Sequence, residues 1–285
     1  MTHARGIELL LRAGDGFDLA KVRTASTPGF DGFGKGSGKK EGEKSLAAGA
    51  ADLEGLQEML YANGLLGDRR RILLVLQSMD TSGKGGIVSH VVGSVNPYGV
   101  HIAQFKAPTE EEKAHDFLWR IRKQLPGPGM LGVFDRSHYE DVLVHRVRHL
   151  STPEVIEARY GAIVDFENEL TAGGTTVIKI MLHISRDEQK DRLQARLDDP
   201  TKNWKFNPSD IDARLQWDDY MEAYQIAITR TSTDAAPWYV IPADHKWYGR
   251  LAVQQVLLDA LRDLHQDWPL ADYDVAEQKA RLAAD

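Results

Sequence analysis

The chain has 285 residues, of which 42% are hydrophobic and 27% charged, and its formal net charge is −7. This length suits one large α/β domain, and the acidic balance excludes a general nucleic-acid-binding protein, which needs a basic surface. Because the sequence has no cysteine, a disulfide framework and a thiolate zinc site are also excluded. The longest aliphatic run, residues 72–76, is too short to cross a membrane, and the N-terminus lacks the apolar core of a signal peptide. We therefore expect a cytoplasmic protein whose partners include neither nucleic acid nor membrane.

The first 46 residues are predicted to form a mobile arm. Glycine and lysine are dense between Thr27 and Lys44, which is typical of irregular structure. A solvated linker is the simpler interpretation, and a basic arm that holds a polyanion or a neighbouring subunit is the alternative. Residues 47–268 are predicted to form the folded domain, and residues 269–285 a C-terminal tail.

Strands and helices are expected to alternate along that domain. Apolar runs predict strands at residues 72–76, 100–105, 130–134, 176–184 and 238–241. Amphipathic periodicity and capping residues predict helices over 48–66, 84–95, 109–124, from 138, from 153, and over 185–197, 208–228 and 248–265. This alternation predicts a parallel, doubly wound sheet with helices on both faces.

The first strand leads into a loop that is suited to binding phosphate. Residues 78–86 resemble the P-loop pattern G-x-x-x-x-G-K-[ST], in which backbone N–H groups and a lysine hold phosphates. Lys84 occupies the lysine position, but Ser78 replaces the first glycine, and Gly85 replaces the residue whose hydroxyl normally binds magnesium. Asp80 lies inside the loop, so we expect a phosphate site with rearranged metal ligands. The phosphate contacts are predicted from Ser82, Gly83 and Gly85.

Two further strand ends carry residues that suit phosphate chemistry. Since ligands bind at the carboxyl ends of parallel strands, Lys106, Asp135 and Arg136 are expected to approach the loop. Asp80 and Asp135 are predicted to share one or two Mg²⁺ ions, whereas the alternative role of Asp135 is a helix N-cap. Arg136 is expected to bind phosphate, and Lys106 is a weaker candidate. Glu140 is most simply an acid of the first helical turn.

A basic segment at approximately residues 186–210 is predicted to be a lid. Arg192 and Arg196 are four residues apart and share one helix face, and Lys202 and Lys205 follow in an irregular stretch. The simpler interpretation is ion pairing with neighbouring aspartates. A lid that closes over phosphates would exclude water, which competes as a phosphoryl acceptor.

Taken in order, these motifs resemble those of the polyphosphate kinase 2 family. The resemblance spans roughly residues 15–268 and rests on segments 76–86, 105–109, 115–120, 134–143, 192–205 and 236–241. It implies a three-layer, P-loop kinase-like α/β fold with a helical lid. It also implies reversible phosphoryl transfer between inorganic polyphosphate and a nucleotide, with Mg²⁺, or Mn²⁺ as an alternative, and a homo-oligomeric assembly.

The resemblance also assigns roles by position. Asp80 would orient or deprotonate the acceptor phosphate and hold metal, and Lys84 would bind phosphates at the transfer point. Asp135 would be the other metal ligand, and Arg136 a phosphate clamp. Phosphates of the polyphosphate chain or of the nucleotide would be bound from the lid by Arg192, Arg196 and Lys205. Asp210 falls on a family motif without an assigned role.

The segment His138-Tyr139-Glu140 resembles the branch of the family that accepts both AMP and ADP. The branch confined to diphosphates tends to have tryptophan and asparagine at positions 138 and 140. We therefore expect conversion of ADP to ATP and of AMP to ADP, with guanine nucleotides as further candidates. Two alternatives stay open: a nucleoside-monophosphate kinase with a nucleoside triphosphate donor, and a non-catalytic nucleotide-binding regulator.

Overall fold

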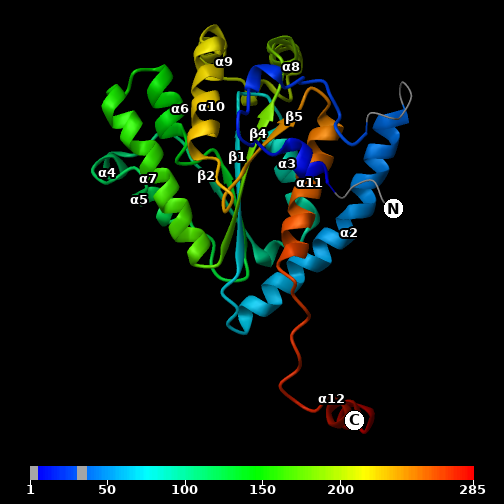
Figure 1. Ribbon diagram of the computed structural model, residues 1–285. Coiled ribbons are helices and arrows are strands. Elements are labelled where there is room, and N and C mark those ends of the chain that lie inside the picture. Colours follow the sequence, from blue (N-terminus) through cyan, green and yellow to red (C-terminus); the bar gives the residue numbers. More distant parts are fainter. Residues whose placement is uncertain (1–5, 31–36) are drawn as a thin grey trace.

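The computed structural model describes residues 6–30 and 37–285, which form a parallel five-stranded sheet between two layers of helices (Figure 1). The strand order is β2-β3-β1-β4-β5, and every neighbouring pair is parallel. The strands are β1 (Arg71–Ser78), β2 (Val100–Gln104), β3 (Leu131–Asp135), β4 (Thr175–His183) and β5 (Trp238–Pro242). The predicted α/β class with a parallel sheet is thus confirmed.

Strand β1 occupies the centre of the sheet, and its composition explains why. Residues 72–76 are entirely apolar and have no solvent exposure. A strand that is apolar on both faces is stable only where helices cover both sides of the sheet. The loop that follows β1 therefore starts from the middle of the molecule, between the ends of β3 and β4.

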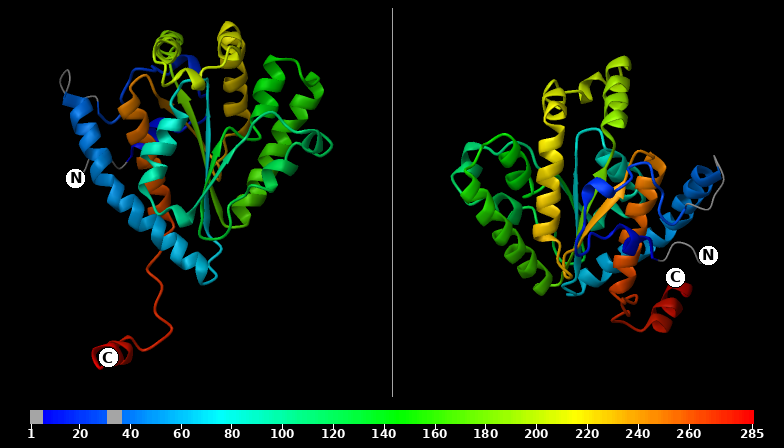
Figure 2. Two further views of the ribbon diagram at one scale, coloured as in Figure 1. Left: turned by 180° about the vertical axis from the view of Figure 1, so that it is seen from behind. Right: turned by 45° about the horizontal axis from the view of Figure 1, so that its top comes forward.

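The two helical layers come from different parts of the chain. One face of the sheet is covered by α2 (Ser37–Leu65), α3 (Lys84–His90) and α11 (Lys246–Asp263), and the other by α6 (Glu140–Val147), α7 (Pro153–Ala172) and α10 (Trp217–Thr231). Figure 2 shows α8 (Arg186–Asp198) and α9 (Ser209–Leu215) beyond the carboxyl ends of the strands. The predicted lid segment therefore lies above the loop that follows β1.

The structure corrects several predicted helices. The helix expected over 109–124 is two short helices, α4 (Glu110–Lys113) and α5 (Trp119–Arg122). The Asp116 carboxylate accepts a hydrogen bond from the Leu118 backbone N–H (2.9 Å), and such a local bond competes with continuous helix. The helix expected over 84–95 ends at His90, and the one expected over 208–228 is divided between α9 and α10.

The expectation of irregular structure over residues 27–44 is wrong for residues 37–44, which belong to α2, while residues 31–36 lie outside the described part. A Cβ at Gly42 would come within 2.2 Å of the Trp247 ring. The glycines here allow α2 to approach α11 closely instead of providing flexibility. In the same N-terminal region, helix α1 (Ile7–Leu11) packs against α11 and β5, and Leu19 and Phe30 are buried in the core.

The C-terminal segment ends in α12 (Val275–Ala283), a helix that the sequence did not predict. It lies away from the body of the molecule at the end of an extended stretch (Figure 1), and none of its residues is buried. Among the described residues, no helix combines the length and apolar character required to cross a membrane.

Candidate active site

The loop after β1 is held in a tight turn by its own atoms. The Ser82 hydroxyl donates to the Met79 carbonyl (2.8 Å), and both Thr81 (φ +67°) and Gly83 (φ +119°) have left-handed backbones. This conformation is unfavourable for threonine, and strain of this kind concentrates at functional sites. The local geometry is therefore that of a phosphate-binding loop, as the sequence pattern predicts.

Ser78, which replaces the first glycine of the pattern, contacts the loop lysine. The Lys84 ammonium donates to the Ser78 hydroxyl (3.0 Å) and is 3.4 Å from the Ser78 carbonyl oxygen. The Ser78 hydroxyl in turn donates to the Met79 carbonyl (2.8 Å). The serine side chain is therefore buried and accepts a hydrogen bond from the lysine ammonium, which helps to position it.

The end of β3 brings Asp135 and Arg136 next to this loop. Asp135 pairs in register with Leu76 of β1, and Arg136 adopts a left-handed backbone (φ +64°). The Arg136 guanidinium then lies 3.2 Å from the Asp80 carboxylate and 3.9 Å from that of Glu140. Burial opposes its charge, but Glu140 and Asp80 outweigh that effect and raise the pKa of Arg136. The guanidinium is thus fixed as a cation between two acids.

Glu140 has a larger role than a first-turn acid. Its carboxylate faces the site rather than solvent, and burial raises its pKa against the opposing effects of Arg136 and Lys84. Asp210 behaves similarly, because burial and then the nearby charge of Asp80 raise the pKa of Asp210. Three acids, Asp80, Glu140 and Asp210, therefore converge on one region in which Arg136 acts on all of them.

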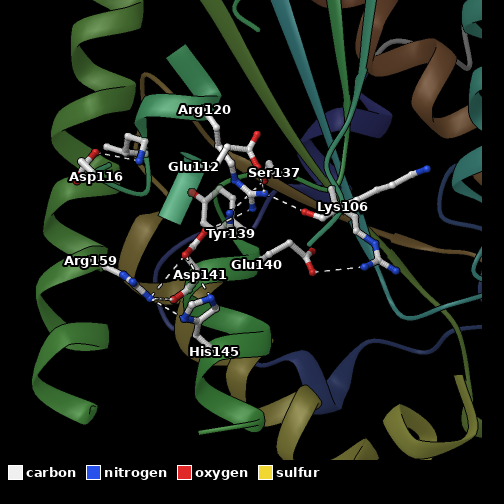
Figure 3. Close-up of polar contacts among 12 residues, drawn as sticks. Lys106, Glu112, Asp116, Arg120, Ser137, Tyr139, Glu140, Asp141, His145 and Arg159 are labelled. Carbon is white, nitrogen blue, oxygen red and sulfur yellow. Dashed lines mark hydrogen bonds and ion pairs between the residues drawn. The ribbon is translucent and has the colours of Figure 1, made fainter. Parts of the chain in front are cut away.

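Sequence reasoning missed Arg120, which organises one wall of this region (Figure 3). Its guanidinium donates to the Lys106 carbonyl (2.8 Å) and pairs with Glu112 (3.8 Å) and Asp141 (3.9 Å). The side chain is 9% exposed, so these contacts are screened little by water. Arg120 thereby ties the segment after β2 to the first turn of α6. It lies within a family motif, but nothing local distinguishes it from a surface arginine.

A buried network of polar side chains holds the segment that leads from β3 into the first turn of α6. Lys179 of β4 has no solvent exposure, and its ammonium lies 2.5 Å from the Glu167 carboxylate. The Tyr139 hydroxyl donates to the same carboxylate (2.8 Å), and His138 is 3.4 Å away from it. These contacts hold the residues between Arg136 and Glu140 in place. A single lysine within an apolar strand gave no indication of this role.

Two cavities flank the phosphate-binding loop in the described part of the chain. One, called here the α11 cavity, measures about 620 Å³ and lies between the loop, α3, α8 and α11. The other, called the α10 cavity, measures about 570 Å³ and lies between α6, α10 and the segment after β2. Arg196 and Lys205 line both cavities. A group that passes from one cavity to the other would therefore move beneath these two cations.

The predicted site residues divide between the cavities. The α11 cavity is lined by Ser82, Gly83, Gly85, Arg192, Arg196 and Lys205. The α10 cavity is lined by Asp80, Lys106, Arg136, Glu140, Asp210, Arg196 and Lys205. Lys84 and Asp135 line neither cavity, although both act electrostatically on residues of the α10 cavity. The structure also adds residues that the sequence did not single out, namely Arg148, Tyr220, Tyr224, Lys246 and Arg250.

Arg192 is engaged with protein groups instead of being available to a phosphate. Its five N–H donors contact the Glu188 carboxylate and four backbone carbonyls, those of Thr81, Ser82, Ala243 and Asp244, at 2.6–3.1 Å. Helix α8 is thereby tied to the loop and to the end of β5. A phosphate contact from Arg192 would require the loss of some of these bonds. By contrast, Arg196 donates to a single carbonyl, that of Lys205 (3.1 Å), and pairs with Asp210 (3.6 Å).

The residues present fit a magnesium ion held by few ligands. Asp135 Oδ2 accepts from Gln104 (3.1 Å), whereas Oδ1 is buried without a hydrogen-bond partner. A buried carboxylate oxygen without a partner is costly unless a cation binds it. No group of three or more His, Cys, Asp or Glu suited to a metal is found among the described residues. However, Mg²⁺ usually needs only one or two carboxylates besides phosphate oxygens and water.

These features define a P-loop phosphotransferase. The model of the family described as polyphosphate kinase 2 (PPK2) matches residues 36–269, and the chain therefore belongs to this family. The predicted family and class of enzyme are confirmed.

Individual relatives agree with this assignment. An AMP/ADP-polyphosphate phosphotransferase of Meiothermus ruber is 47% identical over 253 residues, which cover 89% of this chain and 91% of the relative. An ADP-polyphosphate phosphotransferase of Rhodopseudomonas palustris is 38% identical over 276 residues, which cover 90% of this chain and 91% of the relative. The crystal structure of polyphosphate kinase 2 from Arthrobacter aurescens TC1 matches with a TM-score of 0.95 and 56% identity, covering 100% of this chain and 99% of that one.

Proposed function

We propose that the chain catalyses reversible phosphoryl transfer between inorganic polyphosphate and adenine nucleotides, with both ADP and AMP as acceptors. The observation that carries this proposal is the meeting of two chemically different cavities at the phosphate-binding loop. Their shared lining residues, Arg196 and Lys205, mark the point of transfer.

The α11 cavity suits the polyphosphate. Its lining includes the loop residues and many cations, namely Arg192, Arg196, Lys202, Lys205, Lys246 and Arg250. The α10 cavity suits the nucleotide, because Tyr220, Tyr224 and Leu143 offer aromatic and apolar surface for a nucleoside. Arg136 and Lys106 in the same cavity would face its phosphates.

The chemistry is an in-line transfer. A phosphate oxygen of the nucleotide attacks the terminal phosphorus of polyphosphate, and the bond from that phosphorus to its bridging oxygen breaks. The shortened polyphosphate leaves with that oxygen. Lys84, Arg136 and Arg196 would balance the charge of the transferring group, and Asp80 would orient the acceptor phosphate. Positioning and electrostatics suffice, so no covalent enzyme intermediate is needed.

Magnesium is part of the proposal, with manganese as an alternative. Asp135, through its unpartnered Oδ1, and Asp80 would hold the ion. When bound, it would neutralise phosphate charge at the transfer point.

The choice of acceptor is supported by the names of the relatives and by Glu140. One relative is named for AMP and ADP and the other for ADP. Of the two positions that separate the branches, His138 is buried at 1% exposure, whereas Glu140 lines the α10 cavity. Any direct effect on the acceptor would therefore come from Glu140.

One assay tests the function. Polyphosphate is offered with AMP, ADP, GMP or GDP in turn, and AMP is offered in parallel with GTP as the only donor. We expect ATP from ADP and polyphosphate, and ADP followed by ATP from AMP. Product formation only with GTP as donor would instead identify a nucleoside-monophosphate kinase. Nucleotide binding without transfer under Mg²⁺ or Mn²⁺ would identify a regulator.

A further inference from the structure

Helix α11 contributes two cations to the α11 cavity that belong to none of the sequence motifs. Lys246 and Arg250 are four residues apart, so they lie on one face of the helix, and both line the cavity. Neither side chain forms an ion pair or hydrogen bond with any residue in the described part of the chain. Two other cations of this cavity are compensated by protein groups: Arg192 is fully engaged, and the Lys202 ammonium lies 2.5 Å from the Asp199 carboxylate.

The charges around these two residues favour an anion. Burial and then the positive charge of Arg192 lower the pKa of Lys246, to which Arg250 and Lys202 also contribute. Burial also lowers the pKa of Arg250, and the nearby negative charge of Glu43 opposes that effect only in part. Glu188 and Asp191 also line the cavity, but Glu188 is already paired with Arg192 at 2.6 Å. A negatively charged ligand would relieve the repulsion among the cations.

Two adjacent glycines of α3, Gly85 and Gly86, line the cavity between the phosphate-binding loop and Arg250. A Cβ at Gly85 would meet no atom within 4 Å, and a Cβ at Gly86 would lie 3.5 Å from the Arg250 guanidinium. At these two positions the cavity is therefore lined by backbone alone, which leaves a narrow strip free of side chains. The strip gives a physical reason for glycine at position 85, where the P-loop pattern has a hydroxyl residue.

We propose that Lys246 and Arg250 form a distal subsite for polyphosphate, reached from the loop across Gly85 and Gly86. A linear polyanion places charge at every phosphate, so a chain with its terminal phosphate at Lys84 would meet these cations farther along. This inference rests on the proposed function. It makes long chains better donors than short ones, because only a long chain occupies both ends of the cavity.

The test compares Lys246→Ala and Arg250→Ala with the wild type, using long-chain polyphosphate and tripolyphosphate as separate donors to ADP. For the long chain we expect KM to rise about tenfold in each variant, the effect of one lost charged contact. For tripolyphosphate we expect a rise of at most about twofold. Lys279→Ala, which removes an exposed lysine of α12, is the charge-matched control and should leave both KM values unchanged.

Binding of long-chain polyphosphate without nucleotide, measured by calorimetry, gives a readout independent of turnover and should weaken by the same factor. Thermal unfolding checks that Arg250→Ala folds, and exposed Lys246 provides a second variant with little effect on folding. Wild-type KM for the long chain in both variants would overturn the subsite, as would equal increases for both donors. Absence of transfer from any polyphosphate by the wild type would instead overturn the proposed function.

Discussion

Replacement of Arg192 by lysine tests whether Arg192 acts as a structural clamp, which holds α8 to the loop and to the end of β5, or as a phosphate ligand. The substitution keeps the positive charge but reduces five N–H donors to three on a single nitrogen. A lysine can reach the carbonyls of Thr81 and Ser82 or those of Ala243 and Asp244, but not both pairs. Two carbonyls that now accept from Arg192 would lose that donor. At roughly 1–2 kcal/mol for each lost bond, the free energy of unfolding should fall by about 2–4 kcal/mol.

For a chain of this size, that loss corresponds to a decrease in Tm of about 3–7 °C. Thermal unfolding measures the effect, and hydrogen exchange locates it, because residues 81–83 should exchange faster when α8 is released. Arg196→Lys is the matched control on the same helix. Arg196 donates to a single carbonyl, so its substitution should change Tm by no more than about 2 °C.

Wild-type Tm and exchange in Arg192→Lys would refute the clamp, particularly if KM for polyphosphate rose in the same variant. Such a result would mean that the bonds to the carbonyls contribute little and that the guanidinium serves the substrate.

Three further predictions concern the reaction. Asp80→Asn and Lys84→Ala should each lower kcat roughly a hundredfold or more, the scale of one lost electrostatic contact; near-normal turnover in both would contradict their assigned roles. Asp135→Asn should raise the Mg²⁺ concentration for half-maximal activity roughly tenfold, measured by titrating the ion after chelation, and an unchanged requirement would remove Asp135 from the ion site. Burial raises the pKa of Glu140, so the charged carboxylate destabilises the folded state, and this cost appears as pH rises through the folded pKa. Glu140→Gln should therefore gain stability relative to the wild type at pH 7 compared with pH 4 in urea unfolding, and the opposite trend would show that Arg136 outweighs burial.

Three expectations from the sequence, besides the roles of the individual site residues, stay predictions. These are the division into arm, domain and tail, a lid that moves over approximately residues 186–210, and a homo-oligomer. The packing of α1 and α2 against α11 shows that the described part of the arm is joined to the domain.

The sequence alone determined the strands, the phosphate-binding loop and the strand-end residues. Their signals are local: the apolar run at residues 72–76 requires cover on both faces, and the loop pattern depends on neighbouring residues. Arg136 lies beside Asp80 as predicted (3.2 Å), because parallel strands end at a common edge.

Only the tertiary structure decided the roles of residues whose contacts lie far away in the sequence. The glycine-rich composition of residues 37–44 predicts irregular structure, yet these residues form helix, and Trp247 packs against Gly42. The sequence predicts Arg192 as a phosphate ligand, but its N–H donors contact backbone carbonyls about 50 and 110 residues away in the chain. The sequence did not single out Lys246 and Arg250, because they line the cavity only once α11 has packed beside the phosphate-binding loop. A side chain's role follows from the groups that surround it, and these groups are assembled only when the chain folds.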